Sequence, residues 1–165
     1  MNDFLSLMRH DFKVVKIESR DATGISDHLK NLRTLIASHD GIYPGIDKWF
    51  YDKVIGGLKR NERVGFVGYF DEKPAVSAVV KKANDAKICH ISVDNQFQGM
   101  KIGQLFMILM VLQVRNFATR MHVTMPESLW IEKGEFFRSF MFTESERNHT
   151  QYRADDSELR LGGLY

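Results

Sequence analysis

The strongest constraint on the fold is a change of periodicity after residue 101. Residues 102–118 predict a helix that is apolar almost all round its middle, which indicates burial on more than one face. Strand-like segments lie on either side of this helix, at 87–94 and 121–124. A strand, a buried helix and a second strand, in that order, predict a β-α-β crossover.

An antiparallel meander is predicted before this crossover. The segments 63–70 and 74–82 are rich in β-branched and aromatic residues, and the short connection between them is typical of a hairpin. Asn84 and Asp85 mark a second turn, which leads into the strand at 87–94.

Further elements are predicted before the meander and after the crossover. The earlier ones are a strand at 12–17, a helix capped by Ser26 or Asp27 and ended by Gly41, and a helix over 46–58 with a weak end at Gly56–Gly57. The later ones are a helix at 132–140 and closing strands at 143–146 and 152–161.

The order β-α-α-β-β-β-α-β-α-β-β predicts an α+β fold with a single mixed, mostly antiparallel sheet flanked by helices. We expect one domain over 12–165, preceded by an N-terminal arm at 1–11. The length of 165 residues and the apolar content of 44% suit one domain with a sizeable core.

Composition also disfavours several classes of partner. A formal net charge of +2 disfavours a dedicated nucleic-acid-binding module. The chain shows neither the pattern of a signal peptide nor an apolar run of about 20 residues, so we expect a cytoplasmic protein with no membrane partner. The sequence leaves open whether the protein forms a homodimer.

Disulfide and metal chemistry are not expected. The one cysteine, Cys89, can form no internal disulfide and no multi-cysteine zinc site. Cys89 lies in a predicted strand, where we expect a small buried side chain rather than a nucleophile. Five of the histidines show no metal-ligand spacing: His10, His28, His39, His122 and His149.

The loop from Asp94 to Gly103 connects a strand to the start of the buried helix, which is where an anion site is expected. The first N–H groups of a helix have no partner in the helix, and the helix dipole favours negative charge there. A plain strand-to-helix turn is the structural alternative.

Residues 88–94 and 96–105 resemble motif A of the GCN5-related N-acetyltransferase (GNAT) superfamily, and the element order resembles its acyl-CoA N-acyltransferase fold. The resemblance implies that acetyl-CoA is the acyl donor. The pyrophosphate of coenzyme A would then bind main-chain groups of Gln98, Gly99, Met100, Lys101, Ile102, Gly103 and Gln104. The pantetheine arm would bind the strand at Ile91 and Val93.

The implied activity is direct transfer of an acetyl group from acetyl-CoA to an amine acceptor, either a small molecule or a peptide. Three positions depart from the family pattern. Lys101 replaces the first glycine, Phe137 replaces the tyrosine that protonates the departing thiolate, and Ser128 stands where an asparagine is common. The alternative is a catalytically weak or inactive module of the same fold that binds coenzyme A, a partner protein or RNA.

Transfer to an amine needs a base, and three residues are candidates. His90 lies on the strand that would line the acyl site, and alternation groups it with Ile88 and Ser92, opposite Cys89. A packed core histidine is its alternative role. Glu127 and Ser128 follow the short strand at 121–124, where helix capping is the alternative.

Three other features have ordinary interpretations. The run 105–112 is expected to be core packing. The resemblance implies that Trp49, Phe50 and Tyr51 shape an acceptor pocket, and Trp49 and Phe50 also fit a core stripe. The basic cluster of Lys53, Lys59, Arg60 and Arg63 fits a solvated face or an acidic partner.

Overall fold

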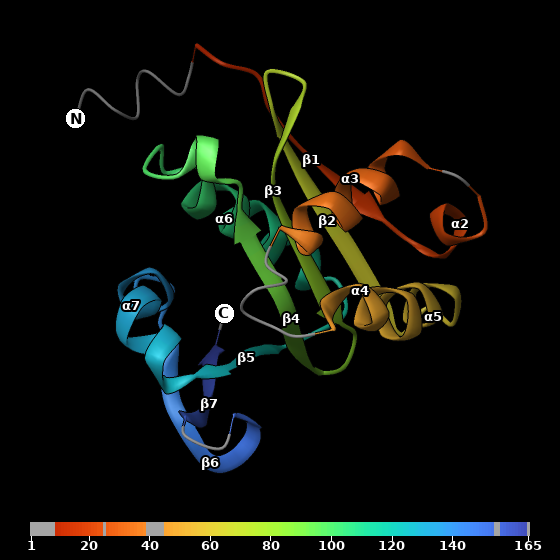
Figure 1. Cartoon of the computed structure of the whole chain (residues 1–165). Helices are drawn as coiled ribbons and strands as arrows, with labels where there is room; N and C mark the ends of the chain where they lie inside the picture. Colours follow the sequence, from red (N-terminus) through yellow and green to blue (C-terminus); the bar gives the residue numbers. More distant parts are fainter. Residues whose placement is uncertain (1–8, 25, 39–44, 154–155, 165) are drawn as a thin grey trace.

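A computed structural model describes residues 9–24, 26–38, 45–153 and 156–164. Within it, one seven-stranded sheet has the strand order β1-β2-β3-β4-β5-β7-β6 (Figure 1). The strands are β1 (Phe12–Ile17), β2 (Arg63–Phe70), β3 (Lys73–Lys81), β4 (Asp85–Val93), β5 (Arg120–Pro126), β6 (Thr143–Arg153) and β7 (Asp156–Leu164).

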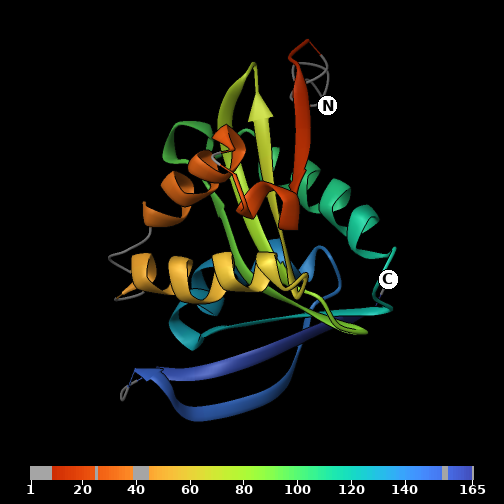
Figure 2. The same cartoon turned by 90° about the vertical axis from the view of Figure 1, so that its right-hand side faces the viewer.

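Helices cover both faces of the sheet (Figure 2). One face carries α3 (Asp27–Ala37), α4 (Ile46–Trp49), the π-helical segment η1 (Phe50–Ile55) and α5 (Gly56–Lys59), with the short α2 (Ser19–Ala22) nearby. The other face carries α6 (Ile102–Val114) and α7 (Glu127–Arg138). A single 3-10 turn, η2 (Asn95–Phe97), precedes α6.

The predicted fold class is confirmed. Strands β1 to β4 form an antiparallel meander, and β4 pairs with β5 in parallel across the α6 crossover. Strands β5, β7 and β6 are antiparallel neighbours. The result is the mixed, mostly antiparallel single sheet expected from the periodicities.

Two buried clusters hold the layers together. The larger cluster lies between the sheet and the α6–α7 side and includes Phe66, Phe106 and Met110. The smaller cluster lies on the α3–α5 side and includes Leu32 and Phe50. We refer to these two sides of the sheet as the α6 face and the α3 face.

The expectation that the run 105–112 is all core packing is wrong at its outer positions. Phe106, Met107 and Met110 are buried, but Ile108 is 48% exposed and Leu112 is 52% exposed. A helix that packs on one side of a sheet keeps an outer side, whatever its composition. None of the described helices is long and apolar enough to cross a membrane.

Gly56 and Gly57 do not end the second helix, because α5 continues to Lys59. A Cβ atom at Gly57 would lie 2.5 Å from Cδ of Arg63, so the glycine makes room for the arginine stem. The helix expected at 102–118 ends at Val114, where the N–H groups of Phe117 and Ala118 both bond to the Val114 carbonyl.

The C-terminal elements differ most from expectation. Helix α7 begins at Glu127 rather than 132, because Pro126 ends β5 and serves as the N-cap. Strand β6 ends at Arg153, whereas the sequence predicted an end at 146. Strand β7 runs from Asp156 to Leu164, whereas the sequence predicted a strand over 152–161. Strand β6 is an edge strand with a polar sequence, so no apolar alternation marked its length. The prediction that the first helix ends at Gly41 is wrong, because α3 ends at Ala37 with Ser38 as its C-cap. Gly41 itself and most of the arm 1–11 lie outside the described residues.

Candidate functional site

Strands β4 and β5 pair over only part of their length. Asp85 to Ile88 pair with Arg120 to Val123, and beyond these residues no pairing joins the two strands in the described structure. Strand β4 continues to Val93 while β5 turns away from it (Figures 1 and 2). A wedge therefore opens in the sheet, and the β5-facing edge of residues 89–93 offers main-chain groups to a ligand.

A bulge in β4 lies at the closed end of this wedge. Val79 of β3 pairs with His90 and Val80 pairs with Ile88, so Cys89 is the extra residue. The bulge changes the alternation. Ile88 belongs to the core of the α6 face, whereas Cys89 packs against the core of the α3 face.

The predicted grouping of His90 with Ile88 and opposite Cys89 is therefore wrong, although its grouping with Ser92 is confirmed. Nε2 of His90 lies 2.9 Å from Oγ of Ser92 and 3.2 Å from Oγ of Ser77. Both serines are buried. These contacts favour the core role for His90, and its role as a base stays a prediction.

The loop after β4 is held by its own side chains. Asp94 accepts a hydrogen bond from the Gln96 N–H at 2.9 Å. The side-chain amide of Gln98 donates to the Val93 carbonyl at 3.3 Å and to Oδ1 of Asn95 at 2.9 Å. The Gln98 side chain thus fastens the loop to the end of β4. The main-chain N–H groups of Phe97, Gln98 and Met100 bond to carbonyls within the loop.

Helix α6 starts beside this loop. In the described structure, the main-chain N–H groups of residues 101–104 have no acceptor. A Cβ atom at Gly103 would lie 3.2 Å from Cγ2 of Val93 and 3.4 Å from Cε2 of Phe136. Gly103 therefore brings the start of α6 close to both β4 and α7. This arrangement suits an anion such as a pyrophosphate.

Lys101, the N-cap of α6, has a φ of +60°. This left-handed conformation is easy for glycine and strained for other residues. The left-handed backbone at Lys101 therefore gives a physical reason why motif A of the resembled family has a glycine at this position. Its side chain is exposed.

Phe137 lies inside the apolar cluster of α7 and is only 5% exposed. Its ring centroid is 5.1 Å from that of Phe136 and 5.8 Å from that of Phe142. Both contacts are edge-to-face. The position that holds a proton donor in the resembled family is therefore an entirely apolar packing position here.

Glu127 is engaged in an ion pair. Its Oε1 lies 2.7 Å from Nη1 of Arg147, which also bonds Glu144 at 3.1 Å. The two carboxylates raise the pKa of the Arg147 guanidinium, with Glu127 as the larger cause. The pair links the start of α7 to β6. Ser128 is the second residue of α7, so its expected role as the N-cap is wrong, because Pro126 takes that position.

A polar cluster that the sequence did not indicate lies at the base of the wedge. Nδ1 of His122 lies 2.9 Å from Oδ1 of Asp85, and Nη2 of Arg160 lies 2.6 Å from Oδ2 of Asp85. The net shift of the His122 pKa is downward, because burial, the largest cause, and the cations Arg160 and Lys87 lower it, whereas Asp85 raises it. The three residues come from β4, β5 and β7, so no local motif could have grouped them.

Two members of the predicted basic cluster, Arg60 and Arg63, are engaged by other side chains. Arg60 pairs with Glu62, with contacts of 2.9 Å from both Nε and Nη2. Arg63 places Nη1 2.8 Å from Sγ of Cys89 and its guanidinium over the Trp49 ring at 5.9 Å. Cys89 thus has a basic neighbour that was not evident in sequence.

The three aromatic residues predicted for an acceptor pocket differ in how far they are buried. Phe50 is buried in the core of the α3 face, Trp49 is half-buried and Tyr51 is 50% exposed. Within the described ranges, no three potential metal ligands come together.

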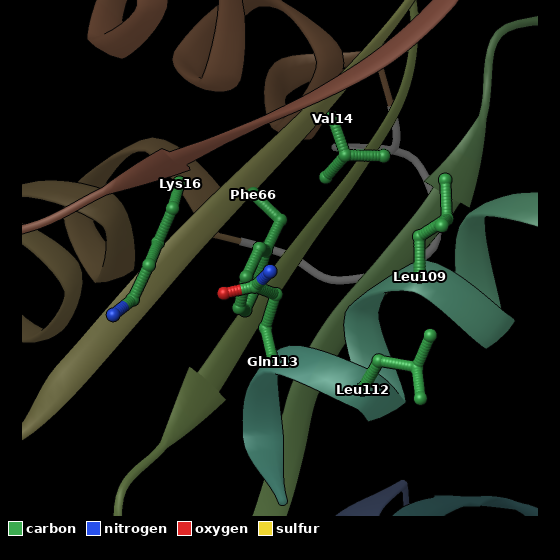
Figure 3. Close-up of a pocket in the computed structure, with 6 residues that line it drawn as sticks. All are labelled: Val14, Lys16, Phe66, Leu109, Leu112 and Gln113. Carbon is green, nitrogen blue, oxygen red and sulfur yellow. The ribbon is translucent and has the colours of Figure 1, made fainter. Parts of the chain in front are cut away.

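One groove of about 240 Å³ lies away from the wedge. It runs between β1 and the outer side of α6, and Val14, Phe66 and Leu109 contribute to its lining (Figure 3). Strands β2 and β3 separate β1 from β4, so this groove is not part of the wedge.

Comparison with known proteins places the fold. No family model and no curated protein sequence matches the chain. Among solved structures, the ribosomal-protein-S18-alanine N-acetyltransferase from Escherichia coli is similar, with a TM-score of 0.74 and 13% identity over 93% of this chain and 94% of that one. A GNAT-family acetyltransferase from Desulfovibrio desulfuricans has a TM-score of 0.70 and 14% identity, over 94% of this chain and 98% of that one.

A third similar structure is a GNAT-family acetyltransferase from Elizabethkingia anophelis with acetyl-CoA bound. It has a TM-score of 0.65 and 10% identity, over 93% of this chain and 98% of that one. The chain therefore has the fold of the GCN5-related N-acetyltransferases. The resemblance predicted from motif A is confirmed at the level of the fold.

Proposed function

We propose that this protein is an acyl-CoA-dependent N-acyltransferase that moves an acetyl group from acetyl-CoA to an amine acceptor. The observation that carries the proposal is the β4–β5 wedge with the start of α6 beside it. The similar structure from Elizabethkingia anophelis, described with acetyl-CoA bound, supports acetyl-CoA as the donor. The proposal keeps the cytoplasmic location expected from the sequence.

In this proposal, the pyrophosphate of coenzyme A lies against the main chain of residues 98–104. The four N–H groups of residues 101–104 donate to it, and the α6 dipole stabilises its charge. The pantetheine arm pairs with the open edge of β4 at Ile91 and Val93. Both side chains pack on the core of the α6 face, which fixes the strand without using its open edge.

The acceptor amine attacks the thioester carbonyl in the wedge, and the thiolate of coenzyme A leaves. Phe137 can donate no proton, so the thiolate takes its proton from solvent. The acceptor is a small molecule or a peptide that reaches the wedge beside His90, Glu127 or Ser128. These three residues stay candidates for the acid–base chemistry.

A second function is favoured by one observation, the burial of Phe137 among aromatic rings. A protein that no longer needs to protonate a thiolate can keep a phenylalanine there. Such a module would bind coenzyme A, a partner protein or RNA without efficient transfer.

Calorimetric titration with acetyl-CoA, followed by a thiol-release assay with 2-phenylethylamine, separates the two functions. We expect saturable binding of acetyl-CoA and release of thiol that depends on the amine. Binding without amine-dependent release of thiol favours the module. A wild-type protein that takes up neither acetyl-CoA nor coenzyme A at millimolar concentration contradicts both coenzyme proposals.

A further inference from the structure

His122 lies on the α3 face of the sheet at the closed end of the wedge. Its neighbours Met121, Val123 and Met125 are buried in the core of the α6 face, so alternation directs His122 to the opposite side. It pairs with Lys87, one position before the last β4–β5 pair. Cys89, where β4 becomes free, is two residues further on, which is about 7 Å along a strand.

The ring of His122 has a defined orientation. Asp85 lies 2.9 Å from Nδ1, and a carboxylate can only accept a hydrogen bond, so the neutral ring carries its proton on Nδ1. Arg160 fixes the other carboxylate oxygen at 2.6 Å and reaches Glu146 at 3.4 Å with Nη1. This places the lone pair of the ring on Nε2, which has no partner within the described part of the chain.

The charged groups that face His122 are Asp85 and Lys87 from β4 and Arg160 from β7. Asp85 raises the pKa of the imidazole, whereas burial and the two cations lower it, with burial the largest cause. The net direction is downward from the ordinary value near 6.5. His122 is therefore neutral at pH 7, as a proton acceptor must be.

We propose that His122, oriented by Asp85, is the general base of acyl transfer. The inference rests on the proposed function. The amine nitrogen forms a bond to the acetyl carbon, the C–S electron pair goes to sulfur, and the amine proton passes to Nε2 directly or through one water. The imidazolium releases this proton to solvent, and the thiolate takes one proton from solvent, so the reaction balances.

Two comparisons favour His122 over the candidates predicted from sequence. Nε2 of His90 already contacts two buried hydroxyls. In His122 the nitrogen with a partner is Nδ1, so Nε2 keeps its lone pair. The carboxylate of Glu127 is paired with Arg147. A base needs a lone pair that no donor occupies, and Nε2 of His122 has no partner in the described structure.

The test compares His122→Gln with His90→Gln. Glutamine keeps a side-chain N–H donor of similar length but has no basic lone pair, so His122→Gln removes the base while it leaves Asp85 a possible donor. We expect kcat/KM for acetylation of 2-phenylethylamine, spermidine and an alanine-terminated peptide to fall about 100-fold or more at pH 7. The Kd for acetyl-CoA should stay within about twofold. The acid limb of the pH profile should disappear in His122→Gln and persist in His90→Gln.

Asp85→Asn tests the positioning role, because removing the negative charge lowers the pKa of His122. The acid limb should then move to lower pH while kcat falls, and a purely structural bridge would not move that limb. Equal rates in His122→Gln and the wild type overturn the inference. So does a wild type that binds acetyl-CoA but acetylates none of the three amines.

The nitrogen chemical shifts of His122, measured by NMR on the intact protein, give a test independent of turnover. We expect the Nδ1–H tautomer and a pKa below 6.5. An imidazolium at pH 7, or the opposite tautomer, overturns the inference. Absence of acetyl-CoA binding contradicts the proposed function itself, and binding with His122-independent transfer contradicts only the base.

Discussion

The main-chain N–H of Phe142 donates to the carbonyl of Phe137 at 3.1 Å, and this bond closes the end of α7 around Met141. Met141 itself donates to the Arg138 carbonyl at 2.9 Å. The two bonds form a Schellman motif, and the Phe137–Phe142 ring contact is its usual apolar partner. Met141 occupies the left-handed position with a φ of +63°, where glycine is the common residue.

Met141→Gly should therefore stabilise the protein. The side chain is 75% exposed, so few contacts are lost, while the left-handed strain is removed. We expect about 1 kcal/mol, which raises Tm by about 2–4 °C in a domain of this size. The matched control is Ser139→Gly in the same turn, where φ is −62°. The control should lower Tm, and a rise in both variants contradicts the account.

Lys101→Gly should likewise raise Tm, because its φ is +60°. If the lysine has no role in phosphate binding, the Kd for coenzyme A stays equal or falls. Lys101→Ala keeps the strain and removes the charge, so it separates the two effects. Weaker binding of coenzyme A in both variants, with unchanged binding of a pantetheine fragment, would assign a phosphate contact to the Lys101 ammonium.

Phe137→Tyr should raise turnover about tenfold or more in the thiol-release assay, because a phenol can protonate the leaving thiolate. The Kd for coenzyme A should stay nearly constant. Burial of a hydroxyl in the aromatic cluster should lower stability by about 1–3 kcal/mol. Phe140→Tyr, a half-buried position on the same turn, is the control and should leave turnover unchanged. Retained binding without a gain in rate places the proton donor elsewhere.

The lowered pKa of His122 predicts a pH dependence of stability. Between its folded-state pKa and the unfolded value near 6.5, the unfolded chain binds more protons. This contribution is fully present above the unfolded pKa and is lost as pH falls toward the folded pKa. Urea unfolding of the wild type and His122→Gln, compared from pH 7.5 to pH 5, should show a smaller loss in the variant. Parallel curves would contradict the lowered pKa.

The sequence was sufficient for the layout of the fold. The periodicity change at residue 101 placed the crossover, and the meander strands of the structure lie within two residues of their predicted bounds. Strand β6 was underestimated, because an edge strand needs no apolar face. The bulge at Cys89 was not predictable, since one inserted residue leaves no compositional trace.

Part of the candidate site could likewise be predicted from the sequence and part could not. The loop before α6 is recognisable from sequence, because its glycines and its place between a strand and a helix both indicate an anion site. For His122 the sequence offers only a test of metal-ligand spacing. Its partners Asp85 and Arg160 lie on other strands, and only the sheet register brings the three together. Spacing along the chain cannot reveal such a cluster.

The most direct test of the account is the binding of coenzyme A to matched variants at Gly103. Asparagine and aspartate have nearly the same volume, so both press equally on Val93 and Phe136, and only aspartate adds charge at the start of α6. Calorimetry should show saturable binding to the wild type, and Gly103→Asp should bind at least about tenfold more weakly than Gly103→Asn. Equal affinities of the two variants, or no binding to the wild type, would contradict a pyrophosphate site at this helix.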